Sequence, residues 1–200
     1  VNNYIYYQED FEQAYRLYTL ALANAAEMGA MNRLKERKDL SIQAKWRLAA
    51  AYAISGKTKI GNDIVFNIHK TINPYSPNNS TFGSSDRDEA MILESLILLG
   101  KLKDAFQQAQ RVSENLSKET VFSTQSTAYA LIAMGRFAEK MAGNIQFDWV
   151  VNGVSQQAVK TANVMFRKSL KTYPFKGNVR IKNRGTGSVY VSLVSKTVPI

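Results

Sequence analysis

The densest group of acidic side chains in the sequence is the run Asp86-Arg-Asp-Glu89. Carboxylate oxygens are the ligands that Mg²⁺ prefers, so this run could contribute to a magnesium site. Such a site would need further acidic ligands, and the sequence contains no second acidic cluster. Ser85 and Asp88 have the spacing of a capping box, and acidic residues in a first turn complement the positive end of the helix dipole. We therefore interpret the run as a helix start and predict no metal site.

Other catalytic chemistry has few candidates in this chain. His69 is the single histidine, and there is no cysteine. The lack of cysteine excludes disulfides, cysteine-ligated zinc and cysteine nucleophiles. No Ser/His/Asp arrangement, paired-carboxylate motif or glycine-rich phosphate loop can be assembled, and a lone histidine near a helix end is typical of a surface or capping residue. We predict no catalytic, cofactor-binding or metal-binding residues, and hence that the chain is not an enzyme.

The positive charge of the chain is concentrated near its end. Residues 1–143 hold 17 Lys/Arg against 15 Asp/Glu, a net charge of +2, whereas residues 144–200 hold 9 against 1, a net charge of +8. The bases that could face nucleic acid, an acidic glycan or an anionic membrane are Arg167, Lys168, Lys171, Lys176, Arg180, Lys182 and Arg184. No stacking motif of a single-strand binder accompanies them. We predict a solvated face, or one that meets an acidic neighbouring domain, and no nucleic-acid partner.

Hydrophobic periodicity predicts an array of helices before residue 143. The expected helices are about Asp10–Ala25, with Asp10 as its cap, 30–37, Ser41–Ser55, Thr58–Thr71, a helix from Ser84 or Ser85 to Gly100, Leu102–Asn115 and Ser123–Ala142. Nearly all-apolar helices alternate with shorter or amphipathic ones, which indicates an inner and an outer layer of antiparallel helices. An open solenoid and a closed α/α toroid both have this pattern. No apolar stretch is long enough to span a membrane.

After Gly143 the hydrophobic period changes from 3.6 to 2. The segment Ile145–Gly153 alternates and ends in Asn-Gly, a hairpin turn signal. Further strands are expected at 163–170, 177–182 and 188–194. The predicted fold is mainly α: a partial antiparallel α/α toroid of helix pairs at 1–143, followed by a small antiparallel β domain at 144–200.

Four blocks together resemble the thioester-domain region of the alpha-2-macroglobulin and complement family, most closely its bacterial branch. The block Phe122-Ser-Thr-Gln-Ser-Thr-Ala-Tyr-Ala-Leu-Ile-Ala-Met looks like the family's Ser-Thr-Gln helix. Ser41–Gly56 and Arg87–Gly100 look like two earlier inner helices, and Phe175–Ser192 looks like the closing strands of the CUB-like β-sandwich. The resemblance covers nearly the whole chain, and the order of its blocks is more specific than any one motif.

The resemblance implies an α/α toroid within a protein that traps proteases, in many members through a Cys–Gln thioester. Without cysteine this chain has no Cys-x-Glu-Gln motif, and His69 does not match the family's histidine, so no functional residue carries over. We expect a scaffold fragment of a bacterial endopeptidase inhibitor, periplasmic or at the cell surface. Its expected partners are the remaining domains of a parent chain and, through the full-length protein, target proteases. A lipid anchor upstream in the parent chain would be compatible with this location.

The start of the chain and its uncovered apolar faces lead to further expectations. The chain begins with Val1 rather than Met, which we interpret as a piece of a longer protein. A partial toroid leaves apolar faces uncovered, so we expect the fragment to rearrange or to self-associate. The alternative functions are a helical-repeat protein-interaction module with an attached β domain, and an α/α-barrel enzyme, for which catalytic carboxylates are not visible.

Overall fold

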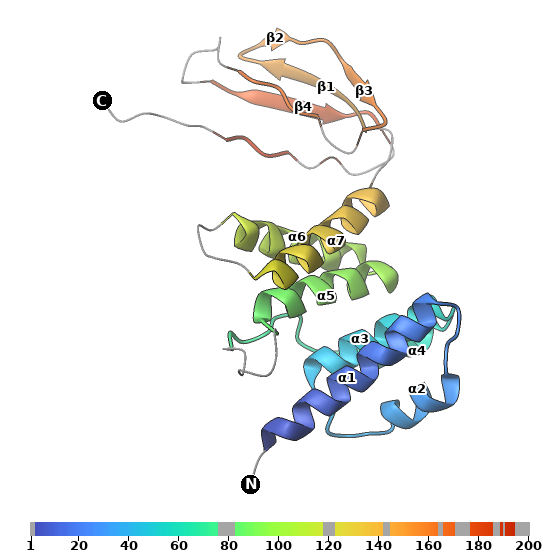
Figure 1. Cartoon of the computed structure of the whole chain (residues 1–200). Coiled ribbons are helices and arrows are strands. Elements are labelled where there is room, and N and C mark those ends of the chain that lie inside the picture. Colours follow the sequence, from blue (N-terminus) through green and yellow to red (C-terminus); the bar gives the residue numbers. More distant parts are fainter. Residues whose placement is uncertain are drawn as a thin grey trace. The chain divides into compact units, whose positions relative to one another are not determined.

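A computed structural model describes residues 3–75, 83–117, 123–141, 145–163, 166–170, 177–185, 189 and 191–194. Within these residues the chain is mainly helical and has a small antiparallel sheet near its C-terminal end, which confirms the predicted fold class (Figure 1). The chain divides into two compact units, Val1–Phe137 and Ala138–Ile200. We call them the helical unit and the β unit. The predicted boundary between 143 and 144 falls in the segment 142–144, outside the described residues.

The helices described by the structure lie close to the predicted ranges. They are α1 (Asn3–Leu22), α2 (Met28–Lys35), α3 (Ile42–Ile54), α4 (Thr58–Ile64), α5 (Ser85–Leu98), α6 (Leu102–Leu116) and α7 (Thr124–Met141). Two helices are exceptions: α1 begins seven residues before the expected Asp10, and α4 was expected to continue to Thr71. Helix α4 ends at Ile64, because the chain turns at Asn67, which takes a left-handed conformation at φ 59°. Val65 before this turn and Ile72 after it are buried in the core against α3 and α5.

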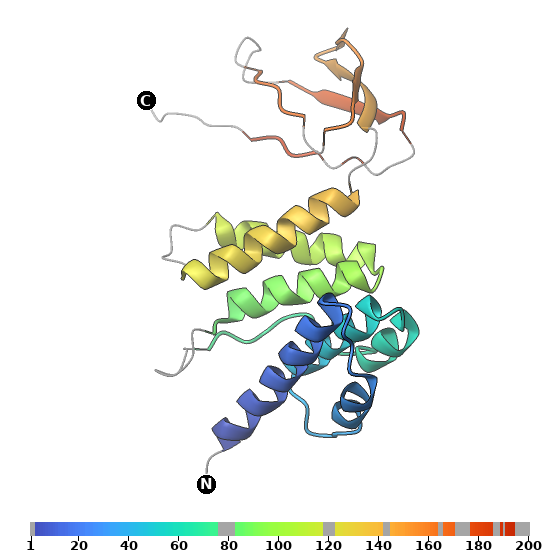
Figure 2. The same cartoon turned by 45° about the vertical axis from the view of Figure 1, so that its right-hand side comes forward.

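Helices α1, α3, α5 and α7, which we call the long helices of the row, run in the same direction as neighbours. Contacts between adjacent helices advance in step along both partners: Asp10 with Ser41 and Tyr18 with Arg47, Gln43 with Asp88 and Arg47 with Glu94, Ser84 with Ser126 and Glu94 with Arg136. Helices α2, α4 and α6 return the chain between them, and α4 packs on α3 as α6 packs on α5 (Figure 2). The predicted alternation of two helix classes therefore corresponds to real helix pairs.

Burial along this row is uneven. Helices α3 and α5 are buried over most of their length, as expected for inner helices. Helix α7 was also expected inside, but Leu131 and Ile132 are 60% and 52% exposed. Leu20 and Leu22 at the end of α1 are exposed as well. The two end members of the row thus keep apolar side chains at the surface, because each has a neighbouring long helix packed along one side.

The helix ends follow simple capping chemistry. Ser41 caps α3 by accepting a hydrogen bond from the Ala44 amide, and Ser84 caps α5 through the Arg87 amide. The expected cap at Ser85 is therefore displaced by one residue. Gly56 ends α3 with φ +74°, the left-handed conformation that glycine adopts without strain.

Asp10 was expected to cap the first helix, and this prediction was wrong. Helix α1 begins at Asn3, and Asp10 lies inside it with 1% of its surface exposed. Its carboxylate accepts the Ser41 amide at 2.6 Å, so it stabilises the start of α3 instead. The polar residue was recognised as a cap, but of the wrong helix.

The β unit is built around one central strand. Strand β1 (Ile145–Val151) pairs antiparallel with β2 (Val154–Ser155), β3 (Val159–Thr161) and β4 (Val179–Asn183). The turn at Asn152 and Gly153 has positive φ at both residues, which confirms the Asn-Gly hairpin. Phe147, Trp149 and Val151 face the apolar side and are buried.

Two of the four expected strands are not strands in the described residues. Residues 166–170 and the described part of 188–194 are irregular, and β3 was not predicted. The physical reason for the first is that this segment crosses the apolar face of the sheet: the Phe166 ring meets Phe147 and Trp149 edge-on, at centroid separations of 5.7 and 6.4 Å. Its hydrophobic residues therefore cover the sheet and do not extend it.

Candidate functional site

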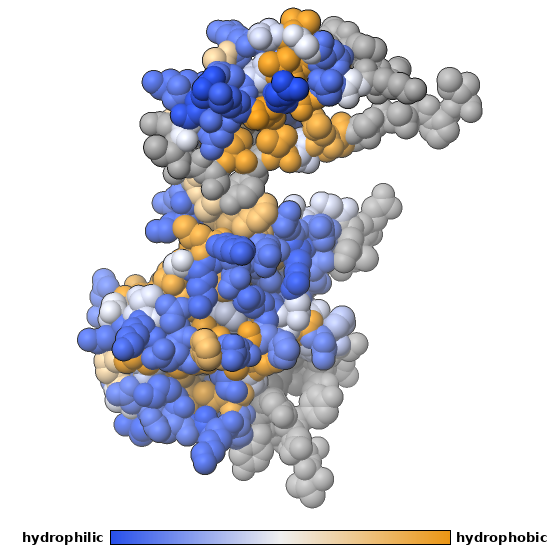
Figure 3. Space-filling view, turned by 180° about the vertical axis from the view of Figure 1, so that it is seen from behind, coloured by the Kyte–Doolittle hydropathy of each residue, from blue (hydrophilic) through white to orange (hydrophobic). Residues whose placement is uncertain are grey.

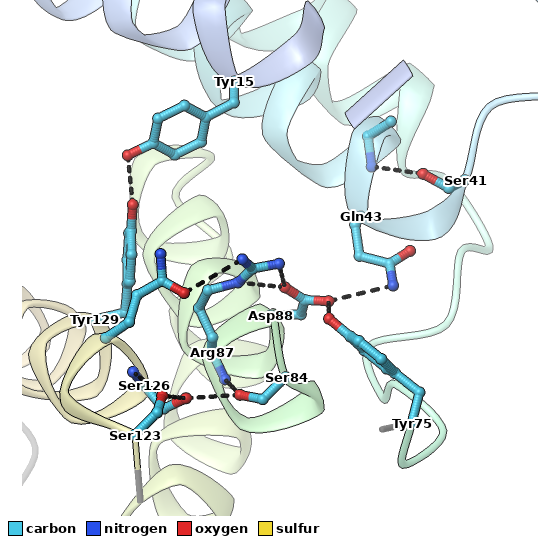
Figure 4. Close-up of polar contacts among 12 residues, drawn as sticks. Tyr15, Ser41, Gln43, Tyr75, Ser84, Arg87, Asp88, Ser123, Ser126 and Tyr129 are labelled. Atoms are coloured by element: carbon cyan, nitrogen blue, oxygen red, sulfur yellow. Dashed lines mark hydrogen bonds and ion pairs between the residues drawn. The ribbon is translucent and has the colours of Figure 1, made fainter. Parts of the chain in front are cut away.

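The most extensive polar site in the described residues lies where the long helices begin. Asp88, in the first turn of α5, is 2% exposed. Its Oδ2 accepts hydrogen bonds from the Tyr75 hydroxyl at 2.8 Å and the Gln43 amide at 3.3 Å, while its Oδ1 accepts two from the Arg87 guanidinium at 2.8 and 2.9 Å (Figure 4). One carboxylate thus joins α3, α5 and the segment after α4 that contains Tyr75. Burial, with the nearby Asp88 charge, raises the pKa of Tyr75.

Three serines connect the starts of α5 and α7. The Ser126 hydroxyl bonds to Ser84 at 2.6 Å and to Ser123 at 2.9 Å, and Ser123 also accepts the Ser126 amide at 3.1 Å. Gln125 accepts a hydrogen bond from Arg87 at 3.5 Å. The Ser123-Thr-Gln125 sequence therefore lies at the start of α7, where Gln125 contacts α5.

A second set of charges lies further along the same helices. Glu94 of α5, 5% exposed, pairs with Arg47 of α3 at 2.7 Å and with Arg136 of α7. Arg47 is 1% exposed, and its guanidinium lies 4.2 Å from the centre of the Tyr18 ring and 5.6 Å from that of Tyr15. Burial, followed by the Glu94 charge, raises the pKa of Tyr18. Within the described part of the chain, the Nε and Nη2 atoms of Arg47 have no hydrogen-bond partner.

The first and last long helices meet through side chains. The hydroxyls of Tyr15 in α1 and Tyr129 in α7 share a hydrogen bond, and Figure 4 shows the two rings pointing toward each other. Arg136 also donates to the Tyr18 hydroxyl at 3.4 Å. Burial and the bond to Tyr15 raise the pKa of Tyr129. The row of helices is therefore curved, and its inner side carries these polar residues, which we call the inner polar cluster: Tyr15, Tyr18, Gln43, Arg47, Arg87, Asp88, Glu94, Gln125, Tyr129 and Arg136.

The inner polar cluster can hold neighbouring helices together through hydrogen bonds and ion pairs. Each carboxylate in it is paired with arginine, so neither Asp88 nor Glu94 is a free general base. His69 lies in the segment after α4, where the Trp46 indole donates to its carbonyl at 2.9 Å, so in the described structure no histidine contacts the three serines. A nucleophilic serine needs such a base.

The acidic run at the start of α5 is dispersed by the fold. Asp86 accepts a hydrogen bond from Asn115 at 2.9 Å, Asp88 lies in the inner polar cluster, and Glu89 accepts the Ile72 amide at 3.4 Å. No group of three or more His, Cys, Asp or Glu side chains that could hold a metal ion occurs among the residues the structure covers. The three carboxylates thus stabilise helix packing through different partners.

Comparison with known proteins gives one informative match. No family model matches the chain, and no match was found among curated proteins. The structure is similar to that of Escherichia coli alpha-2-macroglobulin activated by porcine elastase, with a TM-score of 0.55 and 19% sequence identity. The fold resembles part of a bacterial alpha-2-macroglobulin. The similarity covers 89% of this chain but 16% of that protein, so the chain spans a small part of the length of the protein it matches.

The remaining expectations about sites lie partly outside the described residues. Lys171 and Lys176 lie outside the described residues, whereas Arg167, Lys168, Arg180 and Lys182 are exposed in the β unit. None of the helices that the structure describes combines the length and hydrophobicity that crossing a bilayer requires.

Sequence reasoning missed the inner polar cluster. The available signal was a charged residue in the middle of a nearly apolar helix, as with Arg47 after Trp46 and Glu94 after Leu93. A buried charge requires a partner, so charges at comparable depths of successive inner helices predict an ion-pair chain.

Proposed function

We propose that this chain is a scaffold part of an alpha-2-macroglobulin-like protein that traps proteases, and that it is not itself an enzyme. The observation that carries the proposal is the structural similarity over 89% of the chain, from the curved row of helix pairs to the strands that follow it. The four sequence blocks that resemble the same family also extend from the helices to the strands of this chain. The parent protein, placed in the periplasm or at the cell surface, would supply the segment that a protease cuts.

The internal chemistry supports a scaffold role. The carboxylates of the inner polar cluster pair with arginines, and its tyrosines bond across the row from α1 to α7. Such a network holds helices in a fixed relation but offers no nucleophile beside a base. The alternative, an interaction module built as an open superhelix, is less compatible with the contact between Tyr15 and Tyr129, because an open row would separate its first and last members.

The proposal is tested with the full-length parent protein and an elastase-like protease. We expect cleavage to change the mobility of the parent in native electrophoresis, and the trapped protease to lose activity on large protein substrates but keep it on small peptides. The 200-residue chain alone should neither inhibit nor hydrolyse in the same assays. Cleavage without a change in mobility and without this selective loss would contradict the trapping function; inhibition by the chain alone would contradict the scaffold role.

We also propose that the isolated chain self-associates through the ends of the helical row. Leu131 and Ile132 on α7 and Leu22 on α1 are each 45% exposed or more. Sedimentation velocity should show a species larger than a monomer, and replacing Leu131 and Ile132 with Ser should shift it toward the monomer. A strictly monomeric chain that does not bind an apolar dye would contradict this proposal.

A further inference from the structure

The two faces of the sheet in the β unit differ completely in chemistry. Pairing with β1 places Lys160 beside Gln146, Lys182 beside Asp148 and Arg180 beside Val150, all on the face opposite Phe147 and Trp149. Lys160, Arg180 and Lys182 are exposed, and none pairs with a carboxylate in the described structure. Arg184 joins this face through a 2.6 Å contact with Asp148. We call Lys160, Arg180, Lys182 and Arg184 the basic sheet face.

The charge of this face cannot be neutralised by the β unit itself. The β unit holds ten Lys/Arg against two acidic side chains, Glu139 at the end of α7 and Asp148, which is already paired with Arg184. Lys160 on β3 and Arg180 and Lys182 on β4 therefore remain as uncompensated cations on the two strands that flank β1. Paired strands lie about 4.8 Å apart in a sheet. A surface of this kind attracts a partner that carries many negative charges.

The side chains of the basic sheet face restrict the class of that partner. The two large aromatic residues of β1 lie on the other face, so among the described residues this one offers no ring on which nucleobases could stack. Cores of protein–protein interfaces are enriched in aromatic residues and depleted in lysine, whereas this face carries two lysines and, among the described residues, no aromatic side chain. Figure 3 shows strongly hydrophilic side chains gathered beside hydrophobic ones on the β unit. A flat, lysine- and arginine-rich face is suited to a plane of phosphates, and each such cation near an anionic membrane surface favours binding.

We propose that the basic sheet face holds the chain against an anionic phospholipid surface through electrostatic contacts. This inference does not rest on the protease-trapping function, because it follows from the placement of charges in the β unit. The contact is peripheral: phosphate groups of the lipid neutralise Lys160, Arg180 and Lys182, and no segment needs to enter the hydrocarbon. Because exposed charges are screened by salt, the association should weaken steeply as ionic strength rises.

The test is cosedimentation of the full chain with vesicles of phosphatidylcholine alone and of phosphatidylcholine mixed with phosphatidylglycerol. Wild type should bind the mixed vesicles at low salt and be released at high salt, with no binding to the neutral vesicles. The triple variant Lys160→Gln, Arg180→Gln, Lys182→Gln should lose at least about tenfold in affinity, as expected for three cations near an anionic surface. Circular dichroism establishes that the variant is folded.

A matched control has the same change in net charge at a different place. Lys38, Lys59 and Lys103 are exposed in the helical unit and form no ion pair in the described structure, so their replacement by Gln also removes three charges. This control should keep vesicle affinity within about twofold of wild type. Failure of wild type to bind mixed vesicles at low salt, or an equal loss in the control, would overturn the proposal. Tighter binding to duplex DNA than to the vesicles, abolished in the same triple variant, would overturn it in favour of nucleic acid.

Discussion

The helical unit and the β unit treat their charged residues in opposite ways. In the helical unit Asp88 and Glu94 are almost fully buried, and each lies against an arginine. In the β unit Arg180 and Lys182 are exposed without a carboxylate partner among the described residues. The charge balance of the sequence explains this difference: the helical unit, with 16 bases and 14 acids, can pair its charges internally, whereas the β unit, with ten bases and two acids, cannot. Composition thus predicts where charge stabilises the fold and where it remains available for a partner.

The hydrophobic core of the helical unit is also larger than that of the β unit. The helical unit has two clusters that involve its long helices and the helices between them. The β unit buries Phe147, Trp149 and Val151 under one irregular segment and its neighbours. Single substitutions should therefore change the stability of the helical unit strongly and that of the β unit weakly. The predictions below test this difference, beginning with the change expected to have the largest effect.

Glu94→Gln should have the largest effect, because it leaves the buried charge of Arg47 without its counterion. Removing one partner of a buried pair destabilises a protein by about 3–5 kcal/mol. The loss should appear in the free energy of unfolding, measured with urea and followed by the helical circular dichroism of the full chain. The fluorescence of Trp149, isolated by Trp46→Phe, should report a smaller change in the β unit.

The control for Glu94→Gln is the exposed pair of Glu12 and Arg16, at 3.8 Å on α1. Glu12→Gln should alter the free energy of unfolding by less than about 0.5 kcal/mol, since exposed i,i+4 pairs contribute little. An equal effect of the two substitutions would show that the inner polar cluster is no more important than a surface pair. The contrast between the two units would then have to rest on packing alone.

The second prediction concerns close packing between paired helices. A Cβ atom on Gly61 of α4 would lie 2.6 Å from the Ala49 carbonyl oxygen and 2.7 Å from a methyl group of Leu99. Since backbone cannot easily move away, Gly61→Ala should destabilise by about 1–3 kcal/mol. Gly135→Ala on α7 is the matched control: nothing lies within 4 Å, so removing a helical glycine should stabilise by about 0.5–1 kcal/mol. Denaturation of both variants checks the opposite signs.

The sequence was sufficient for much of the fold because the relevant signals are local. Ser41 and Ser123 stand directly before segments with helical periodicity, and Gly56 follows one. The helices could therefore be placed to within a few residues, apart from the early start of α1 and the short α4. The Asn152-Gly153 turn likewise follows from two adjacent residues. Predictions failed where tertiary contacts decide. Residues 65–72 fit a helical pattern but leave the helix to bury Ile72, and Phe166 covers the sheet in place of extending it.

The inner polar cluster could not be predicted from the sequence because its contacts join distant positions. Tyr15 and Tyr129 are 114 residues apart, and no local pattern relates them. Asp10 illustrates the same limit at shorter range: it was correctly recognised as a capping residue, but its partner is 31 residues away, at the start of another helix. Residue type therefore indicated the kind of interaction, and only the fold supplied the partner.

The third prediction compares two caps within the helical unit. Ser84 caps α5, and its hydroxyl also bonds to Ser126, which is 3% exposed. In the described structure the Ser41 side chain makes the capping hydrogen bond and no other. Ser84→Ala should lower the free energy of unfolding by about 1–2 kcal/mol and Ser41→Ala by about 1 kcal/mol. The double variant Ser84→Ala, Ser126→Ala should lose about 1 kcal/mol more, because it also removes the hydrogen bond that the Ser126 hydroxyl keeps with Ser123. Equal losses from the two single variants would show that the serine contacts between α5 and α7 add nothing.

The smallest effect is expected on the basic sheet face. Replacing Arg180 and Lys182 with Gln removes two exposed cations that have no carboxylate partner in the described structure, so neither an ion pair nor a buried contact is lost. The free energy of unfolding, measured through Trp149 fluorescence, should change by less than about 0.5 kcal/mol, and mutual repulsion between the cations makes a slight gain the expected sign. A loss comparable to that of Glu94→Gln would mean that these cations stabilise the β unit through contacts of their own. The two units would then use charge in the same way, and the basic sheet face would not be free to bind a partner.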